Sequence, residues 1–239
     1  QIMEAVLDAL SQARPERAIA AWGKHRGDYV FAVDPRTNER YVRTSFDYDG
    51  SAGAVWGYDG YQGVTSLTAM GAINRGDVEE MEARLPWRLL KYELLADFTG
   101  AGRWRGGPGV HWEAVNEGSD GQMATGSSDG DVVQGFGVAG GEPSPVCRTF
   151  ILRDGEEIRI KPHRLVDVMQ GDVVRKLSSG GGGVGPPTER DPEMVREDVE
   201  NGLVSVDAAR DTYRVAVDPV TFEIDLDATA ELRGAASAK

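Results

Sequence analysis

Two arginines inside a glycine-rich segment form the most unusual local sequence of the chain. Arg103 and Arg105 lie within residues 100–109, which read GAGRWRGGPG. Glycines leave space around a guanidinium group, which can then present its donors to a carboxylate or a phosphate. The alternative is that both arginines pair with some of the 39 acidic residues and hold a tight turn. Arg103 and Arg105 are therefore candidates for contact with a substrate or an anion.

A run of four glycines is a second candidate for anion contact. It consists of Gly180, Gly181, Gly182 and Gly183. Glycine lets the backbone approach a ligand closely, and successive N–H groups can form a nest for an anion. The alternative is a flexible turn at the end of a sheet strand.

Two segments match the dinucleotide-binding pattern G-x-G-x-x-G, namely residues 135–140 and 180–185. That pattern binds a pyrophosphate only where a helix follows directly, because the helix N-terminus holds the ligand. Proline follows both matches, at Pro143 and at Pro186. The sequence therefore argues against a Rossmann domain.

The other residues that could do chemistry form no complete catalytic set. His25, His111 and His163 are isolated, and neither H-x-x-x-H nor HExxH occurs. The phosphate-binding P-loop pattern GxxxxGK[ST] is also missing from the sequence. The single cysteine, Cys147, is predicted to be a small buried residue. We assign no catalytic residue and no metal ligand to this chain.

Charge and composition narrow the class of protein. The 239 residues carry a net charge of −13. A strongly acidic surface repels the phosphate backbone of nucleic acid. No apolar run reaches the ~18 residues of a membrane span, and no secretory signal is visible. We expect a cytoplasmic protein that binds neither nucleic acid nor membrane. Because the chain opens on Gln1 inside a helical pattern, we also expect it to be cut from something longer.

Hydrophobic periodicity predicts an α+β fold. The β-rich body is expected to be sandwich- or barrel-like and mostly antiparallel, with an N-terminal helix and a small helical C-terminal tail. The predicted divisions are an N-terminal helical segment at 1–27, a glycine-rich β domain at 28–187 and a helical region at 188–239. The expected elements are a helix at 2–13, a hairpin at 28–48, a loop system at 49–76, a short helix at 78–84, and strands at 89–95, 110–115, 150–153, 157–160, 165–169 and 173–177.

Capping residues define the C-terminal helices. Asp191 can cap a helix that has Pro192 at its first position, and Asn201-Gly202 would end it. Ser205 caps a second helix. A strand pair at 213–217 and 221–225 and a last helix from about 227 complete the chain.

The order of short motifs over residues 85–217 resembles the C-terminal half of the hydantoinase B/oxoprolinase family, which includes the large subunits of acetone and acetophenone carboxylases. Residues 2–84 fit more loosely. The motifs are LPWRLLKYEL at 85–94, GAGRWRGGPG at 100–109, GFGVAGGEP at 135–143, GDVV at 171–174, the glycine run with ERDP at 189–192, NGLVS at 201–205 and AARDTY at 208–213.

The resemblance implies one part of a multi-subunit ATP-dependent enzyme. A hydantoinase A-type partner would bind ATP and phosphorylate the substrate oxygen. The family's metal ligands lie in the N-terminal half of the B-type subunit, which this chain does not include. ATP and a divalent metal are thus expected in the whole complex, and neither is expected to be bound by this chain alone. The isolated chain is expected to be inactive.

Three positions depart from the family pattern. The glycine run usually leads into Tyr-Gly-Asp-Pro, whereas residues 184–187 read Val-Gly-Pro-Pro. The helical tail usually has Asp-Tyr-Gly-Val, whereas residues 212–215 read Thr-Tyr-Arg-Val. His111 stands where an apolar or basic residue is expected.

Several hypotheses about the function compete. The favoured one is action on a ketone through a phosphorylated enol, as in acetone or acetophenone carboxylase, since a B-type protein divided into separate chains suggests a large heteromeric complex. The first alternative is ATP-dependent hydrolysis of a cyclic amide of the hydantoin or 5-oxoproline type. A non-catalytic scaffold subunit and a stand-alone ligand-binding β domain are the others.

Overall fold

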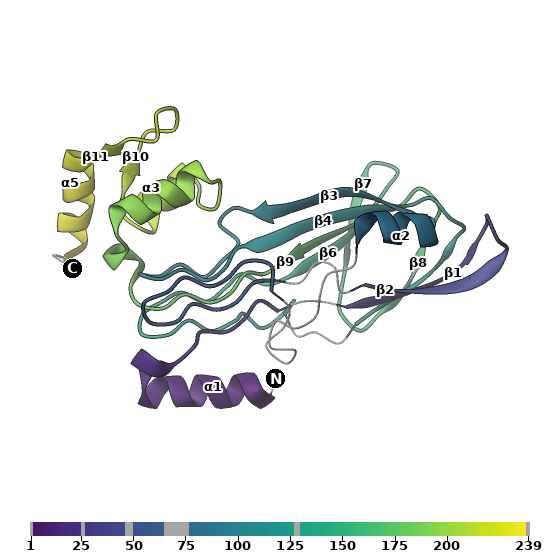
Figure 1. The fold of residues 1–239 in the computed structure, drawn as a ribbon, viewed down its shortest axis with the longest axis horizontal. Coiled ribbons are helices and arrows are strands. Elements are labelled where there is room, and N and C mark those ends of the chain that lie inside the picture. The colour runs from purple at the N-terminus through teal and green to yellow at the C-terminus, as the bar shows by residue number, and fades with distance from the viewer. Residues whose placement is uncertain (1, 25–26, 46–49, 65–76, 127–129, 238–239) are drawn as a thin grey trace.

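Alternating apolar residues along short strands produce two antiparallel sheets that face each other (Figure 1). The computed structural model describes residues 2–24, 27–45, 50–64, 77–126 and 130–237. The four-stranded sheet has the order β2-β1-β5-β8, and the five-stranded sheet has the order β3-β4-β9-β6-β7. The strands are β1 (Asp28–Asp34), β2 (Glu39–Ser45), β3 (Trp87–Leu95), β4 (Gly109–Asn116), β5 (Gly121–Thr125), β6 (Arg148–Arg153), β7 (Glu156–Ile160), β8 (Leu165–Val168) and β9 (Val173–Ser178).

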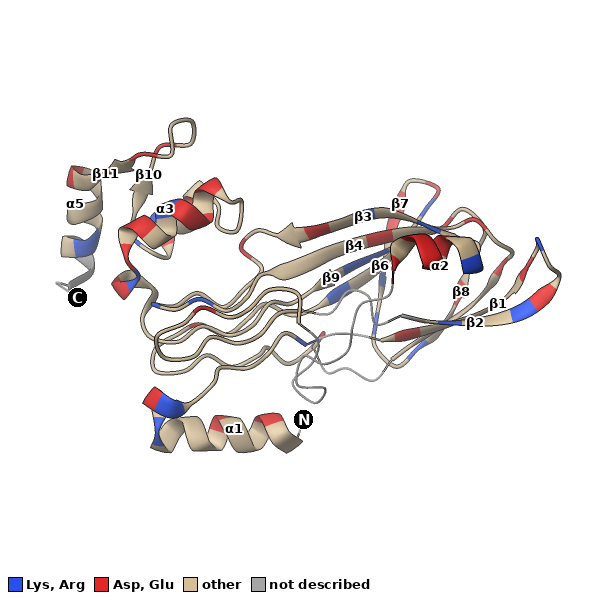
Figure 2. Ribbon diagram, viewed as in Figure 1, with Lys and Arg blue, Asp and Glu red and all other residues tan. Residues whose placement is uncertain are grey.

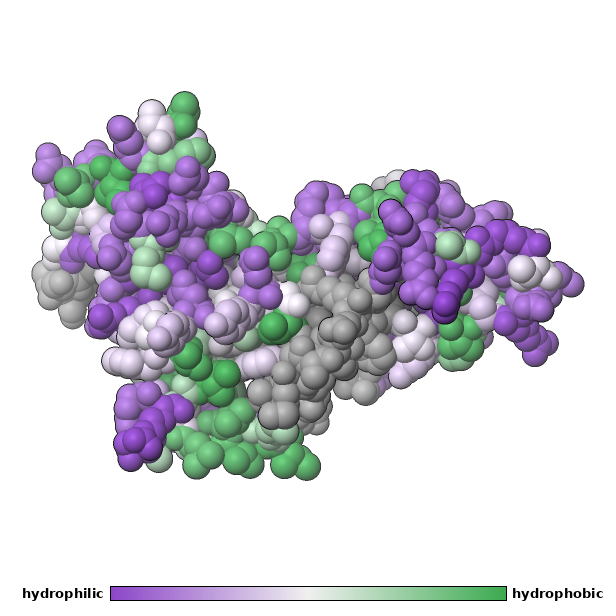
Figure 3. Space-filling model, viewed as in Figure 1, coloured by the Kyte–Doolittle hydropathy of each residue, from purple (hydrophilic) through white to green (hydrophobic). Residues whose placement is uncertain are grey.

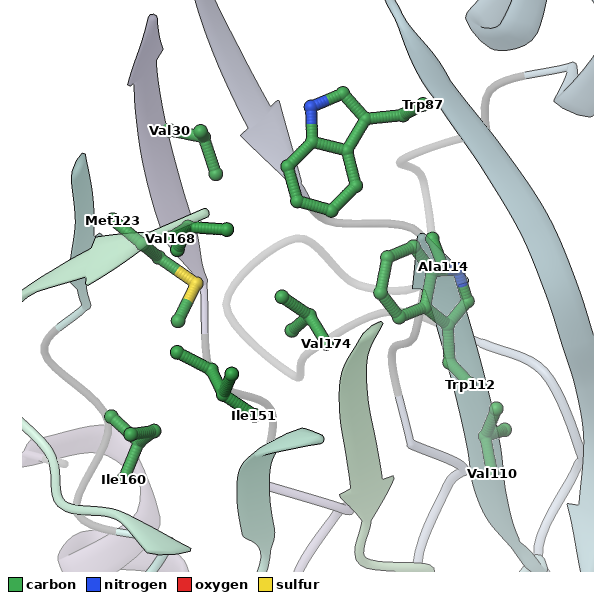
Figure 4. Close-up of a cluster of buried hydrophobic side chains, with 10 residues drawn as sticks. All are labelled: Val30, Trp87, Val110, Trp112, Ala114, Met123, Ile151, Ile160, Val168 and Val174. Carbon is green, nitrogen blue, oxygen red and sulfur yellow. The ribbon is translucent and has the colours of Figure 1, made fainter. Parts of the chain in front are cut away.

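The hydrophobic core of the sandwich lies between these sheets (Figure 4). Val30, Met123 and Val168 come from the four-stranded sheet and meet Trp87, Trp112 and other residues of the five-stranded sheet. Burial of each large apolar side chain contributes roughly 1.5–3 kcal/mol to folding. The predicted sandwich-like, mostly antiparallel body is therefore confirmed. Of the described strands, sequence reasoning missed β5, which is short and contains glycine and glutamine.

Charged side chains also occupy inward positions of the sandwich. Lys176 Nζ lies 2.6 Å from Asp28 Oδ1, and both side chains are 3% exposed. The Arg43 guanidinium lies 4.9 Å from the ring centroids of both Trp87 and Trp112. Cation–π contact with two indoles lowers the cost of burying that charge. The alternation of strand residues alone does not reveal such pairs, because their partners lie on distant strands.

Beside the sandwich, extended segments without regular strands run side by side, and Figure 2 shows that few of their residues are charged. We call them the glycine bundle and define it as residues 18–24, 50–64, 98–108, 135–144 and 179–186. The glycine run, Gly180 to Gly183, belongs to this bundle. Its successive N–H groups donate to different segments, to the carbonyls of Phe98, Gly107, Ala21 and Glu142 at 2.9, 3.0, 2.8 and 3.0 Å.

Close backbone approach explains why these segments need glycine. A Cβ atom on Gly181 would lie 2.0 Å from the Ala52 carbonyl oxygen. One on Gly106 would lie 2.0 Å from the Gly181 carbonyl oxygen. Real Cβ atoms do not approach backbone this closely, so only glycine lets the segments lie in contact.

The C-terminal region confirms the predicted helix caps. Asp191 accepts a hydrogen bond from the Glu193 N–H at the start of α3 (Pro192–Glu200), and Ser205 caps α4 (Val206–Asp211) through Ala208. The strands β10 (Ala216–Val217) and β11 (Ile224–Asp225) pair, and α5 (Leu226–Ser237) follows. These elements enclose their own apolar core, which includes Val195, Val204, Ala209, Tyr213 and Val215.

The remaining helices are α1 (Ile2–Ala13), the 3-10 turns Pro15–Arg17 and Pro187–Glu189, and α2 (Val78–Arg84), whose N-cap is Asp77. No described helix has the length and apolar character needed to span a bilayer.

Residues 18–24, assigned to the helical segment 1–27 from sequence, instead form no helix and join the glycine bundle. Of the predicted loop at 49–76, residues 50–64 belong to that bundle, and positions 49 and 65–76 lie outside the described residues. The division into three regions stays a prediction.

Candidate functional site

Four charged side chains meet where the C-terminal helices rest on the glycine bundle. We call Asp59, Arg105, Arg190 and Asp198 the charge cluster. Arg105 donates from Nε and Nη2 to Asp198 Oδ1, at 2.9 and 2.8 Å. Arg190 Nη2 donates to Asp198 Oδ2 at 2.8 Å. One carboxylate therefore joins two guanidinium groups from different parts of the chain.

Asp59 completes the cluster from the bundle side. Arg190 donates from Nη1 and Nη2 to the two carboxylate oxygens of Asp59, at 2.8 and 2.7 Å. The backbone N–H of Arg105 also donates to Asp59 Oδ1, at 2.9 Å. The formal charges of the four groups cancel, as the burial of charge requires.

Burial and pairing shift the pKa values at the cluster. Burial lowers the pKa of Arg190, but the hydrogen bonds to Asp59 and the attraction of both carboxylates outweigh it, so the net shift is upward. Burial also raises the pKa of the neighbouring Tyr213 hydroxyl. Arg190 is therefore charged and Tyr213 neutral at ordinary pH, and neither is poised to exchange protons.

Arg103 lies nearby in a different environment. Its guanidinium lies 4.8 Å from the ring centroid of Trp104, its Nη1 lies 3.5 Å from Glu189 Oε2, and its side chain is 47% exposed. It opens onto a groove of about 490 Å³, which we call the arginine groove. The groove is lined by Arg103, Trp104, Glu189, Arg190, Asp191, Pro192, Met194 and Arg233.

The predicted site residues thus divide into two groups. The Arg103 N–H donates to the Gly185 carbonyl at 3.1 Å, so the arginine segment does lie directly on the glycine segment. Arg105 points inward, and all four N–H groups of the glycine run donate to backbone carbonyls. These contacts agree with the structural alternatives for Arg105 and for Gly180, Gly181, Gly182 and Gly183. Contact with a substrate stays a prediction, and Arg103 is the member whose guanidinium reaches solvent.

Sequence reasoning missed Asp59, Arg190 and Asp198. Arg190 belongs to a motif that carries the family resemblance, but its partners lie 131 residues earlier and 8 residues later. No local spacing signals such a cluster, because the bundle brings its members together.

Among the described residues, no group of three or more His, Cys, Asp or Glu side chains could hold a metal ion. His111 Nε2 lies 2.7 Å from Glu113 Oε1, and Glu113 also accepts a hydrogen bond from Arg175. His163 has a positive φ of 55°, and His25 lies outside the described residues. The described histidines and their neighbours therefore offer no ligand set for the divalent metal that the resemblance implies.

A second hollow, of about 840 Å³, lies among α4, β10, β11 and α5. Arg210 and Arg214 line it together with mainly apolar residues and three acidic ones. Arg214 adopts φ of 58°, the left-handed region that favours glycine. This is the position where the family pattern has glycine, so the departure noted from sequence is also a conformational one.

Comparison with known proteins decides the family. The sequence profile described as hydantoinase B/oxoprolinase matches residues 1–187. This chain belongs to the hydantoinase B/oxoprolinase family. The match includes the N-terminal residues, where the motifs alone fitted more loosely.

Similarity to individual proteins agrees with this assignment. Caprolactamase subunit beta of Pseudomonas jessenii is 35% identical over 224 residues, which is 91% of this chain. The crystal structure of that ATP-dependent caprolactamase superposes with a TM-score of 0.81 at 31% identity over 95% of this chain. The acetophenone carboxylase delta subunit of Aromatoleum aromaticum is 36% identical, but only over 84 residues, or 34% of this chain.

Acetone carboxylase shares the fold at a lower sequence identity. Nucleotide-free acetone carboxylase superposes with a TM-score of 0.84 over 98% of this chain, at 20% identity. The chain spans 38% of the length of caprolactamase subunit beta, and 36% and 40% of the acetone carboxylase and caprolactamase chains.

Proposed function

We propose that this chain is part of the B-type subunit of a multi-subunit, ATP-dependent enzyme that opens a cyclic amide. The observation that carries the proposal is the 35% identity with caprolactamase subunit beta across 91% of the chain. Its proposed partners are an A-type ATP-binding subunit and the remainder of the B-type subunit. ATP and a divalent metal belong to the whole complex in this proposal and are assigned to no residue of this chain.

The sequence alone favoured a ketone substrate, and ketone carboxylation remains the second candidate. The 36% identity with the acetophenone carboxylase delta subunit supports it. That identity covers 34% of the chain, whereas the caprolactamase match covers nearly all of it. The likeness to acetone carboxylase concerns the fold alone. The balance of identity therefore favours the amide.

In this proposal the chain mainly positions the walls of the arginine groove and supplies no assigned catalytic residue. The charge cluster holds the C-terminal helices on the glycine bundle, and this fixes one wall of the arginine groove. Among the arginines that line the groove, we assign contact with a carboxylate or a phosphate to Arg103, whose side chain is 47% exposed. Glu189 already pairs with it at 3.5 Å, so an anionic ligand would compete with that carboxylate.

The test uses the complete enzyme rather than this chain by itself. The B-type subunit is co-purified with its A-type partner, and ATP hydrolysis is measured with caprolactam, hydantoin and 5-oxoproline, and with acetone and acetophenone plus bicarbonate. We expect a cyclic amide to stimulate ATP hydrolysis and to yield the ring-opened amino acid. Stimulation by a ketone alone would establish the second candidate, and no stimulation by either class would contradict both. The isolated 239-residue chain is expected to show no turnover.

A further inference from the structure

The N-terminal helix α1 turns its apolar side away from the protein. Ile2, Met3, Val6 and Leu10 are 86%, 47%, 52% and 58% exposed. Figure 3 shows a hydrophobic band along α1. Ala5, Ala9 and Ala13 are exposed as well. The apolar stripe that periodicity predicts for residues 2–13 is present, but it faces solvent instead of a core.

The less exposed side of α1 is mainly polar, with Glu4, Asp8 and Ser11 beside one apolar residue, Leu7. Glu4 Oε2 lies 3.3 Å from Lys24 Nζ of the glycine bundle, and the two side chains are 21% and 9% exposed. Ser11 is the buried residue of the helix, and its Oγ donates to the Asp8 carbonyl at 2.7 Å. The helix is thus amphipathic with its orientation reversed relative to the usual one.

The contacts that α1 makes with the body bury little apolar surface. An isolated helix of about 12 residues is marginal in water, and most helices in proteins are stabilised by burial of their apolar face. A contiguous exposed apolar surface of this kind marks a contact with another macromolecule. The four large exposed side chains of α1 therefore point to a missing partner surface.

We propose that the outward face of α1 packs against the part of the B-type polypeptide that relatives carry beyond the region matched by this chain. This inference rests on the proposed function, which supplies that polypeptide. Only 38% of caprolactamase subunit beta aligns with the chain, so most of such a subunit lies outside it. The partner surface is apolar and uncharged, because none of the exposed residues of α1 carries a charge.

Charge argues against two other occupants. A helix that binds an anionic membrane surface carries Lys and Arg around its apolar face, and α1 (IMEAVLDALSQA) contains neither. A second copy of this chain would bring together two molecules that each carry a net charge of −13, which opposes association.

Hydrogen exchange provides the first test. Exchange of the α1 amides is compared between the isolated 239-residue chain and the same sequence within the assembled enzyme. We expect at least tenfold slower exchange in the assembly. Equal exchange in both samples would contradict the proposal. So would protection in the isolated chain that depends on its concentration, or protection induced by vesicles of anionic phospholipid, since these outcomes identify a second copy or a membrane.

Charge substitution provides the second test. The double variant Val6→Glu, Leu10→Glu is compared with the control Val220→Glu, Leu226→Glu, whose positions are 82% and 73% exposed. Both variants should keep the melting temperature of the isolated chain, because all four side chains are already in water. Light scattering should show that this chain no longer associates with the remainder of the B-type polypeptide, supplied as a separate chain, for the α1 variant only. Normal assembly of that variant would overturn the proposal. Because the readout is assembly and not turnover, an error about the substrate would leave it intact.

Discussion

Asp198 Oδ1 accepts two hydrogen bonds from the guanidinium of Arg105, which lies 93 residues earlier in the chain. The two side chains are 10% and 7% exposed, and Asp198 also binds Arg190 through Oδ2. This carboxylate holds helix α3 on the glycine bundle. Removal of its charge would leave two buried guanidinium groups undercompensated.

We therefore predict that Asp198→Asn destabilises the chain strongly. Loss of one partner from a buried ion pair costs about 3–5 kcal/mol, since the remaining charge stays buried. Urea denaturation measures the effect. The control is Glu200→Gln on the same helix, where a 53% exposed side chain pairs with Arg196 and the expected loss is about 0–1 kcal/mol. Similar losses for both variants would show that the charge cluster is unimportant for stability.

Arg103 and Arg105 should respond differently to the same conservative change. Arg105→Lys removes the forked contact with Asp198 and should cost on the order of 1–2 kcal/mol of stability. Arg103→Lys should leave stability unchanged and lower the turnover of the assembled enzyme, if the arginine groove contacts substrate. Melting curves and steady-state kinetics on both variants separate these roles. Unchanged kinetics for Arg103→Lys would remove Arg103 from the site.

The glycine run should tolerate no side chain. In Gly181→Ala the new methyl group would lie 2.0 Å from the Ala52 carbonyl oxygen, so the bundle would have to separate. We expect an insoluble or unfolded product in an expression test. The matched control is Gly234→Ala in α5, where a Cβ atom meets nothing within 4 Å. There the change should stabilise the chain by about 0.5–1 kcal/mol, because alanine is the better helix former.

Local signals in the sequence predicted much of the fold. The hairpin β1–β2 follows from aromatic and β-branched residues on either side of a turn, and Asn38 in that turn has a positive φ of 58°. Asp191 and Ser205 begin the helices that they were expected to cap. Such features depend on residues a few positions apart, which a sequence displays directly.

The glycine bundle and the charge cluster could not be predicted in the same way. Extended segments with many glycines read as loops, because their order comes from hydrogen bonds between segments and not from periodicity. The cluster that joins Asp59, Arg105 and Asp198 then depends on the bundle. The orientation of α1 was also hidden, since an amphipathic pattern shows that an apolar face exists but not which neighbour covers it.

The pair formed by Glu113 and Arg175 predicts a loss of stability in acid. Burial raises the pKa of Glu113, but hydrogen bonds from Arg175 and His111 outweigh it and hold that pKa below its ordinary value. A depressed carboxylate pKa contributes stability that is complete above the unfolded value of 4.5 and is lost as pH falls through the folded value. Urea midpoints measured between about pH 6 and pH 3 should fall less steeply for Glu113→Gln than for the natural chain. Parallel curves would exclude Glu113 as a source of the acid sensitivity.

Substitution by glycine should affect the free energy of unfolding differently at Arg214 and at Arg196. Its φ of 58° places a side chain in the left-handed region, at a cost of roughly 1–2 kcal/mol for a residue other than glycine. Glycine removes that strain but adds about 0.4–1 kcal/mol of backbone entropy to the unfolded chain, so Arg214→Gly should be neutral or stabilising by up to about 1.6 kcal/mol. The same change at Arg196, inside helix α3, should instead destabilise by at least about 1 kcal/mol, because glycine is a poor helix former and the contacts with Glu193 and Glu200 are lost. Denaturation midpoints of the two variants decide the matter, and a similar loss at both positions would show that the backbone at Arg214 is unstrained.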